Sequence, residues 1–429
     1  MSSTLKLPPL LSGSTLALAL VCGSLVSLLS FGPRASLGLF LTPMSDAHQW
    51  SRDVFALALA IQNLVWGLAQ PFAGAAADKL GSGKTIACGG VLYAIGLYLM
   101  SMSGTPLLLH LTAGVLIGLG IAFSSFTLVL AAFAKTVPAH RQGLAFGLGT
   151  AAGSFGQFLF APLGQGLISN IGWQPSLWVL AAITCVIPLL ALVMALIGNP
   201  TAAHKTAAAK AEETARAAGV QPIDLKQTLA TAFKTRSYQL LVAGFFVCGF
   251  HVAFITVHLP PYLADLGMDP ALGAWALALI GLCNIVGSLV SGYCSSHYPK
   301  PYVLSFIYFA RALAILAFIS MPVSPTSVLL FAGTMGLLWL STVPPTSGLV
   351  AVMFGPKYMG TLFGLVFLSH QIGSFLGVWL GGVIYAQTGS YLLLWWAGIA
   401  LGVLAAIVHW PIAERHVPVG QPANSGVSG

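Results

Sequence analysis

The stretch that decides the fold is Ser30-Phe-Gly-Pro-Arg-Ala-Ser36, which places one arginine inside a long apolar run. The run covers residues 15–43, and Arg34 lies about 9 residues, or about 13 Å at 1.5 Å per residue, from its far end. A membrane hydrocarbon core is about 30 Å thick, so Arg34 is expected near the middle of a membrane-spanning helix. Gly32 and Pro33 predict a kink there, because proline removes a backbone donor and clashes with the preceding turn.

The composition indicates the class of protein. Of the 429 residues, 57% are hydrophobic and only 6% are charged. A soluble domain carries about 25% charged residues, so an integral membrane protein is expected. The 48 glycines fit this class, because small residues let helices in a membrane approach closely. The first apolar run is expected to be the first span, since it is too long and too interrupted by glycine to be a signal peptide.

An arginine at mid-depth needs a partner, because its burial there costs about 2.5–3.5 kcal/mol. All nine acidic residues are expected in loops or at helix ends: Asp46, Asp53, Asp78, Glu212, Glu213, Asp224, Asp265, Asp269 and Glu414. No carboxylate is therefore expected at the depth of Arg34. We interpret Arg34 as a binding residue for an anion. The alternative is a structural arginine that is held by helix carbonyls and water.

The sequence excludes several function classes. The net charge of +8 raises the question of nucleic-acid binding, but the basic residues collect in short loops on one side of the expected membrane, which is a topology signal. The six cysteines lie in or beside apolar spans without the spacing of metal ligands. We expect no nucleic-acid partner, no metal site and no cofactor. No catalytic constellation is present, so no enzyme is expected.

Apolar runs separated by short polar turns predict twelve membrane-spanning helices. Their expected ranges are 15–41, 53–77, 84–102, 107–134, 141–169, 174–197, 238–263, 272–294, 302–321, 326–354, 358–386 and 392–411. The predicted fold class is an all-α membrane protein with twelve transmembrane helices in two pseudo-symmetric six-helix bundles.

One long connection divides the spans into two groups of six. The expected units are a cytoplasmic N-terminal tail at 1–14, a bundle at 15–197, a cytoplasmic linker at 198–235, a second bundle at 236–411 and a cytoplasmic tail at 412–429. All Lys and Arg residues except Arg34, Arg52 and Arg311 fall on the side of the N-terminus. Both termini are therefore expected in the cytoplasm.

The two halves resemble each other in sequence. Glycines of the fifth and eleventh spans coincide at a shift of 217 residues, as in Gly147 and Gly364, and Gly74 coincides with Gly292 at a shift of 218. Nearly equal shifts indicate duplication of a six-helix unit. Such symmetry is expected of a transporter with a binding site at mid-membrane between its halves and alternating access by rocking.

A charged turn follows the second span and reads Gly74-Ala-Ala-Ala-Asp78-Lys79-Leu-Gly81-Ser-Gly-Lys84. It resembles the loop signature of the major facilitator superfamily at Gly74, Asp78, Lys79, Gly81 and Lys84. The resemblance implies that the acid caps a neighbouring helix and that the basic residues anchor a cytoplasmic gate. The second-half copy is degraded, with Ser296 and His297 at the positions of Asp78 and Lys79. An ordinary charged turn is the alternative.

Within that superfamily, the sequence is similar to the monocarboxylate transporters and to bacterial oxalate/formate antiporters. Pro33-Arg34 matches a Pro-Lys of some monocarboxylate transporters, whose lysine handles the proton and the substrate carboxylate. Arginine cannot release its proton but can hold a carboxylate bidentately. The family's eighth span often has Asn, Arg and Gly four residues apart. Here these positions are Asn284, Ser288 and Gly292, so the expected arginine is missing.

Further candidate cavity residues are polar or ionisable side chains within apolar spans. Arg311 in the ninth span either stabilises packing or reaches inward to replace the missing arginine. His370 and Gln371 interrupt the eleventh span, and His251 lies near the second-half equivalent of Arg34. A neutral imidazole can donate, accept or titrate, so each histidine either faces the cavity or only joins two helices.

The remaining candidates lie on other spans. Asn63 and Gln157 are polar candidates of the first half, and Trp339 is a candidate for an apolar cavity wall. In the tenth span, Thr342-Val-Pro-Pro-Thr-Ser347 predicts a break, and non-helical backbone at membrane depth normally lines a cavity.

The residues and the resemblance together predict a secondary active transporter that moves a small organic anion, with a monocarboxylate as the first choice. Its expected partners are that anion, a proton or counter-anion, and the lipid bilayer. It is expected to act as a monomer in the cytoplasmic (inner) membrane of a bacterium. Proton symport and anion exchange both remain open. The alternative function is a multidrug-type or metabolite exporter of the same superfamily, although such exporters usually carry an acid in the cavity.

Overall fold

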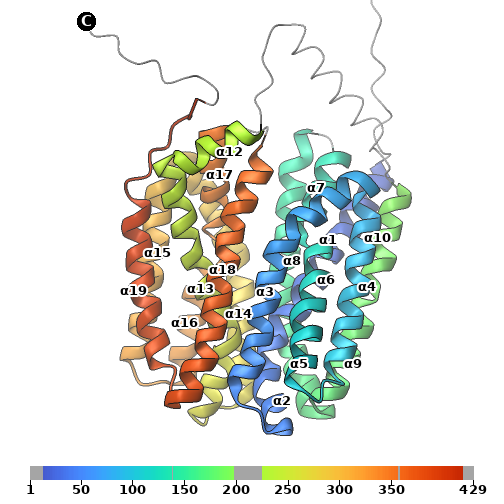
Figure 1. The fold of residues 1–429 in the computed structure, drawn as a ribbon, viewed down its shortest axis with the longest axis vertical. Coiled ribbons are helices and arrows are strands. Elements are labelled where there is room, and N and C mark those ends of the chain that lie inside the picture. Colours follow the sequence, from blue (N-terminus) through green and yellow to red (C-terminus); the bar gives the residue numbers. More distant parts are fainter. Residues whose placement is uncertain (1–12, 138, 198–224, 356–357, 419–429) are drawn as a thin grey trace, which may run out of the picture.

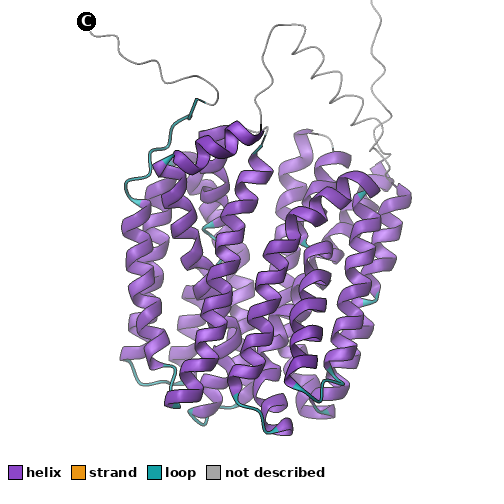
Figure 2. Cartoon of the chain, viewed as in Figure 1, coloured by secondary structure: helices purple, strands orange, loops and turns teal. Residues whose placement is uncertain are grey.

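The fold is entirely helical in the part of the chain that the structure describes. The structure is a computed structural model, and it describes residues 13–137, 139–197, 225–355 and 358–418. Long helices run side by side through the molecule (Figure 1), and short loops join their ends (Figure 2). Eleven helices within these ranges are long and apolar enough to cross a membrane. The expected all-α membrane fold is confirmed.

The first half of the chain forms six rods, and several rods consist of more than one helix. Their bounds are α1 (Gly13–Ser36), η1 (Leu37–Phe40) and α2 (Leu41–His48); α3 (Arg52–Leu80); α4 (Ser82–Met100); α5 (Pro106–Leu109), η2 (His110–Leu116), α6 (Ile117–Ser124) and α7 (Phe126–Thr136); α8 (Ala139–Ile171); α9 (Trp173–Thr184) and α10 (Val186–Ile197).

The second half begins with a short helix and continues with six more rods. Their bounds are α12 (Leu225–Lys234), α13 (Arg236–Asp265), α14 (Pro270–His297), α15 (Lys300–Ser320), α16 (Pro325–Leu338) with α17 (Val343–Phe354), α18 (Met359–Thr388) and α19 (Leu392–His409). We call α1–α10 the first half and α13–α19 the second half. Most of the expected linker, 198–224, lies outside the described residues.

Helix α8 corresponds to one of the twelve expected spans but is not among the eleven apolar helices. It is 33 residues long and carries polar side chains along its length. Two of them, Ser154 and Gln157, are buried and hydrogen-bonded to the second half. Polar residues of α8 therefore form hydrogen bonds inside the bundle.

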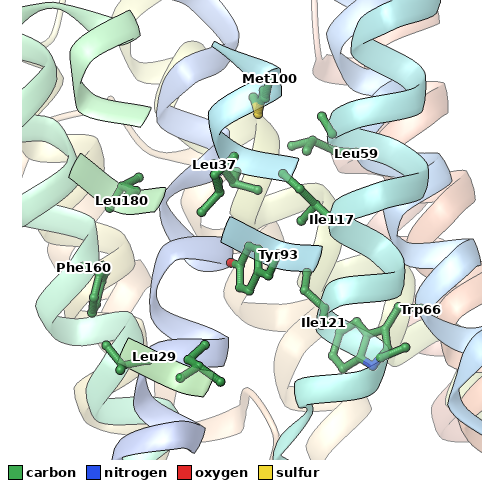
Figure 3. Packing of buried hydrophobic residues seen from close by; sticks show 14 of the residues in the cluster. Leu29, Leu37, Leu59, Trp66, Tyr93, Met100, Ile117, Ile121, Phe160 and Leu180 are labelled. Carbon is green, nitrogen blue, oxygen red and sulfur yellow. The ribbon is translucent and has the colours of Figure 1, made fainter. Parts of the chain in front are cut away.

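Two groups of buried apolar side chains form the core. One comes almost entirely from the first half and the other almost entirely from the second half. Figure 3 shows part of the first group, where Leu59 and Trp66 of α3 lie beside Ile117 and Ile121 of α6. Within a membrane, such packing acts through van der Waals contact rather than through exclusion of water. This arrangement agrees with two bundles, while the bounds assigned to them stay predictions.

The halves approach each other unevenly along the bundle. We call its two ends the α12 end and the α2 end, after the helices that lie there in Figure 1. Helix α3 packs against α18, and α8 packs against α14. Near the α2 end, a Cβ added to Gly382 of α18 would lie 2.5 Å from Cβ of Ala56 on α3. Toward the α12 end, a Cβ added to Gly147 or Gly364 would meet no atom within 4 Å.

The segment after α19 forms a strap across the α12 end of the second half. The backbone N–H of Ala413 donates to Oγ of Ser237 at 3.0 Å, and that of Val417 donates to the carbonyl of Met353 at 2.8 Å. Between them, Glu414 pairs with the ammonium of Lys300 and accepts from its backbone N–H at 2.8 Å. The strap thereby ties α13, α15 and α17 together.

Candidate functional site

Arg34 lies in the last turn of α1 and faces α3. Pro33 lies inside α1, and the chain tightens into the 3₁₀ turn η1 after Ser36. The Ser36 hydroxyl donates to the carbonyl of Pro33 at 2.8 Å. The Arg34 guanidinium is partly buried, and its Nη2 donates to Oδ1 of Asn63 at 2.6 Å. The irregularity near Pro33 is thus a change of helix type at Leu37, three residues after the arginine.

A neutral amide, rather than an acid, is the hydrogen-bond partner of Arg34. Asn63 is buried, and its Nδ2 donates to the carbonyl of Leu59 at 2.8 Å, which directs Oδ1 toward the arginine. Nε of Arg34 is buried without a partner in the described chain. The ion pairs that the structure describes lie elsewhere. Within that part of the chain, Arg34 therefore has no internal counter-charge.

Two aromatic rings flank the Arg34 guanidinium. Its Cζ lies 4.8 Å from the centroid of Trp66 and 5.7 Å from that of Phe31. Contacts of this kind contribute about 0.5–2 kcal/mol. Trp66 donates from Nε1 to Oε1 of Gln70 at 3.0 Å, and Gln70 donates to Oγ1 of Thr127 at 2.8 Å. The cation is therefore bordered by an apolar wall whose position is fixed by hydrogen bonds.

This wall continues into the second half. Trp66 meets Phe367 of α18 edge to face, with ring centroids 5.3 Å apart, and Phe367 stacks on His370 at 5.6 Å. Gln371 lies against α3, because a Cβ added to Gly67 would lie 2.7 Å from Cβ of Gln371. A run of side-chain contacts therefore links the cation of α1 to the polar pair of α18.

The amide of Gln371 accepts hydrogen bonds at its oxygen, from His370 and at 3.5 Å from the Ser374 hydroxyl, and leaves its nitrogen unused. Nδ1 of His370 and Oε1 of Gln371 are 3.1 Å apart, and an amide oxygen only accepts, so Nδ1 carries the proton in this contact. Nε2 of Gln371 is buried and has no partner among the described residues. Gln371 thus lies at the interface of the halves, whereas the His370 ring packs within the second half, between Phe367 and Phe245 of α13, whose ring centroid is 5.1 Å away.

Three other candidates form a second junction between the halves. Nε2 of Gln157 on α8 donates to the carbonyl of Leu277 at 3.1 Å. Nδ2 of Asn284 on α14 donates to Oγ of Ser154 at 2.9 Å, and Ser288 donates to Oδ1 of Asn284 at 3.2 Å. None of these hydrogen bonds involves the arginine of α1. The structure therefore places these residues where α8 meets α14.

Arg311 of α15 binds the end of a broken helix. Helix α16 ends at Leu338, and Nε and Nη2 of Arg311 donate to the Leu338 carbonyl at 3.1 and 2.6 Å. Nη2 also donates to the carbonyl of Trp339. A guanidinium at a helix C-terminus satisfies free carbonyls and opposes the negative end of the helix dipole. Arg311 and Trp339 are both buried and meet at this break.

The break itself occurs next to the proline pair of the tenth span. Proline has no N–H, so the carbonyls one turn earlier lose their helical donors. The hydroxyl of Ser291 donates to the carbonyl of Ser341, and the N–H of Leu340 donates to Oδ1 of Asn284 at 2.9 Å. Side chains of α14 therefore satisfy the freed backbone groups, and Asn284 links the break to the first half.

His251 faces α19. Its Nε2 and the carbonyl of Gly398 are hydrogen-bonded at 2.8 Å, and the imidazole is fully buried. A Cβ added to Gly398 or Gly402 would lie 3.7 or 3.4 Å from the ring, which is ordinary van der Waals contact, so the imidazole packs directly against α19. His251 therefore joins α13 to α19 within the second half. Its position in the sequence did not show the direction of its side chain.

The charged turn lies at the α12 end, between α3 and α4. Gly81 separates the two helices with a φ of +97°, a conformation that favours glycine. Asp78, Lys79 and Lys84 are exposed there, and a Cβ added to Gly74 would meet no atom within 4 Å. The gating role of this exposed turn stays a prediction.

Sequence reasoning missed one polar cluster at the α2 end. Arg52, the first residue of α3, donates to both carboxylate oxygens of Asp265, the last residue of α13, at 2.7 and 2.6 Å. The sequence did single out Arg52, because it is the one basic residue expected in a loop on the outer side of the membrane, where Lys and Arg are otherwise absent. The sequence could not pair it with an acid 213 positions later.

Several known proteins resemble this chain along most of its length. "Uncharacterized MFS-type transporter YcxA" of Bacillus subtilis is 25% identical over 87% of this chain and 90% of that protein. "Monocarboxylate transporter 13" of Rattus norvegicus is 26% identical over 85% and 81%, respectively. "Monocarboxylate transporter 11" of Mus musculus is 29% identical over 85% and 79%.

The fold and a family model agree with these relatives. A crystal structure of a D-xylose-proton symporter matches with a TM-score of 0.70 over 93% of this chain and 97% of that one, at 14% identity, which supports the fold alone. The model of the Major Facilitator Superfamily matches residues 23–378. The chain therefore belongs to the major facilitator superfamily and is a transporter rather than an enzyme.

Proposed function

We propose that this secondary transporter carries a small organic monocarboxylate and that Arg34 binds the carboxylate. The observation that carries the proposal is a partly buried arginine in an apolar helix whose partner is an amide. A guanidinium has five N–H donors and can hold a carboxylate bidentately. One donor is used by Asn63, and the buried Nε is unpaired in the described chain, so donors remain for a ligand.

The surroundings of Arg34 favour a ligand that has a single negative charge and an otherwise apolar structure. Trp66 and Phe31 border the guanidinium, and Asn63 adds no charge. A second carboxylate placed against these rings would lose water without gaining a counter-charge. The relatives that are named monocarboxylate transporters support the same substrate class.

The α12 end is the cytoplasmic end in this proposal. Basic residues such as Lys79, Lys84 and Lys234 are exposed there, and short cytoplasmic loops carry an excess of such residues. Both termini are then cytoplasmic, and the protein works as a monomer in the cytoplasmic membrane of a bacterium. The close approach of the halves at the α2 end makes this the outward-closed state.

Coupling must use a group other than Arg34, because arginine keeps its proton at physiological pH. Along the run of contacts from Arg34, the ionisable side chain in the second half is His370, which stacks on Phe367. A proton carried by His370 or by the substrate gives symport. A second anion that returns on Arg34 gives exchange. Both modes belong to the proposal, and transport assays separate them.

Purified protein in liposomes tests the substrate class. We expect uptake of labelled monocarboxylates, with lactate and benzoate as the first probes, and loss of uptake in R34Q. The matched control is K300Q, which breaks the ion pair with Glu414 at the α12 end and should keep uptake. Uptake of neutral or cationic compounds without binding of any monocarboxylate would contradict the proposal and favour the exporter.

A further inference from the structure

An ion pair joins the two halves at the α2 end. Arg52 begins α3, and Asp265 ends α13. Two parallel N–H···O bonds of 2.7 and 2.6 Å connect them, which is the bidentate geometry that gives arginine–carboxylate pairs their strength. The side chains are 15% and 29% exposed, so water screens the pair only in part.

Two tyrosines of the second half complete the contact around Arg52. Its Nη1 also donates to the hydroxyl of Tyr391 at 3.1 Å, and its Cζ lies 4.1 Å from the ring centroid of Tyr385. Tyr391 lies between α18 and α19 and is 1% exposed. Burial raises the pKa of the Tyr391 hydroxyl, which therefore stays neutral and accepts from the arginine. One side chain of the first half is thus held by three from the second.

We propose that Arg52, Asp265, Tyr385 and Tyr391 form a latch that holds the α2 end closed and that must open in each transport cycle. The geometry points to this role because the contacts of the Arg52 side chain with Asp265, Tyr391 and Tyr385 all cross from the first half to the second. The proposal rests on membership of a family of alternating-access transporters and not on the substrate class. Only the statement that the latch faces outward depends on the proposed orientation.

The latch can bias the two states of the transporter because its contacts exist in one of them. Beneath it, Gly382 of α18 touches Ala56 of α3, so separation of the halves there also pulls Arg52 away from Asp265. A contact that is made in one state and lost in the other shifts the equilibrium by its differential free energy. A weaker latch should therefore increase the population that is open at the α2 end.

A buried position under the latch can report this opening. Val378 of α18 is 0% exposed and packs within the core group of the first half, so it lies at the interface of the halves. In V378C, a membrane-impermeant maleimide added at the α2 side reacts only when that side opens. The parent chain carries six cysteines of its own, so its modification rate is measured separately and subtracted from that of V378C.

We expect R52Q and D265N each to speed modification of V378C about tenfold, which corresponds to a loss of about 1.4 kcal/mol from the closed state. The double variant R52Q/D265N should be no faster than R52Q alone, because R52Q already removes the ion pair together with the contacts of Arg52 with Tyr391 and Tyr385. K300Q, which breaks an ion pair within the second half at the other end, should leave the rate unchanged.

Two results would overturn the latch. One is an unchanged rate in both R52Q and D265N. The other is a double variant whose acceleration equals the product of the two single effects, since independent losses multiply. The assay needs no substrate, so it gives its answer even if the protein transports no carboxylate. D265N supplies the test if R52Q does not fold.

Discussion

At the scale of single residues, Arg34 differs from a lysine in two ways that matter for transport. It holds its charge at every accessible pH, and its planar group can bind Asn63 and a ligand at the same time. A lysine at this position would offer a point charge that loses its proton more readily when buried. We therefore interpret Arg34 as a fixed binding group rather than a proton carrier.

The contrast between R34K and R34Q measures this difference. R34K should keep anion binding but weaken it by about tenfold, because the bidentate geometry is lost while the charge remains. R34Q should abolish binding, since both are lost. Ligand-induced quenching of tryptophan fluorescence in detergent gives the affinities, and Trp66 lies beside the site. Equal affinities for the parent and R34Q would assign Arg34 a structural role.

Arg311 is expected to stabilise the fold rather than to bind substrate. In R311M, the carbonyls of Leu338 and Trp339 lose a charged donor, which should lower the free energy of unfolding by about 2–3 kcal/mol. Thermal unfolding in detergent checks the loss. The exposed Arg415 provides the control, because R415Q should change stability by less than about 0.5 kcal/mol.

Anion binding by R311M distinguishes a structural Arg311 from one that binds substrate. Anion binding measured on the folded fraction should be unaffected, because Arg311 contacts the helix break and not Arg34. Stability equal to that of the parent together with lost binding would make Arg311 the replacement for the arginine that is missing at Ser288.

The sequence identifies charged residues at mid-depth but not the partners that they find. Arg34 and Arg311 stand out because a charge in an apolar span is costly. Asn63 lies 29 positions from Arg34, and the Leu338 carbonyl lies 27 positions from Arg311. Such pairings depend on how helices rotate against each other. Hydropathy does not report that rotation, so the directions of His251 and Arg311 stayed open.

At the scale of helices, apolar runs locate the rods well because the bilayer demands continuous hydrogen-bonded backbone. Interruptions inside the rods are harder to predict. The proline pair marks the break between α16 and α17, whereas the π-helical segment η2 and the break at Ser125 have no comparable signal. These irregular segments depend on tertiary contacts, such as the hydrogen bond from Gln70 to the Ser125 hydroxyl.

The close contact of α3 and α18 predicts the effect of a larger residue at Gly382. In G382V, the added atoms would overlap Ala56, and overpacking of this kind costs about 1–3 kcal/mol in the closed arrangement. We expect the α2 end to open more often, which faster maleimide modification of V378C would reveal. G147A is the control, because its Cβ meets open space. An unchanged rate in G382V would show that the contact is not essential for closure.

At the scale of the whole molecule, the repeat predicts two bundles with a site between them, but not which end of that site is closed. Both states of an alternating-access transporter share the same helices and the same hydropathy. In the latch proposal, the difference lies in contacts such as those of Gly382 and Arg52, which join residues that are far apart in the chain. The sequence therefore predicts the class of motion, and the structure shows one position of it.

Proton coupling can be tested with the whole transporter in liposomes. If His370 carries the proton, an acidic exterior should accelerate monocarboxylate uptake, and H370Q should remove that acceleration. Exchange of internal for external anion should survive in H370Q, because it needs only Arg34. Acceleration that persists in H370Q would assign the proton to the substrate or to another group, and no acceleration in the parent would favour exchange.

The strap after α19 has a consequence for the order in which the protein is completed. Residues 413–417 follow every helix of the two halves, so the ribosome makes them after all of these helices, yet they tie α13, α15 and α17 at the α12 end. Domains generally fold as units during synthesis, the N-terminal one first. The first half can therefore mature early, while the second half keeps three loose helix ends until the strap residues emerge.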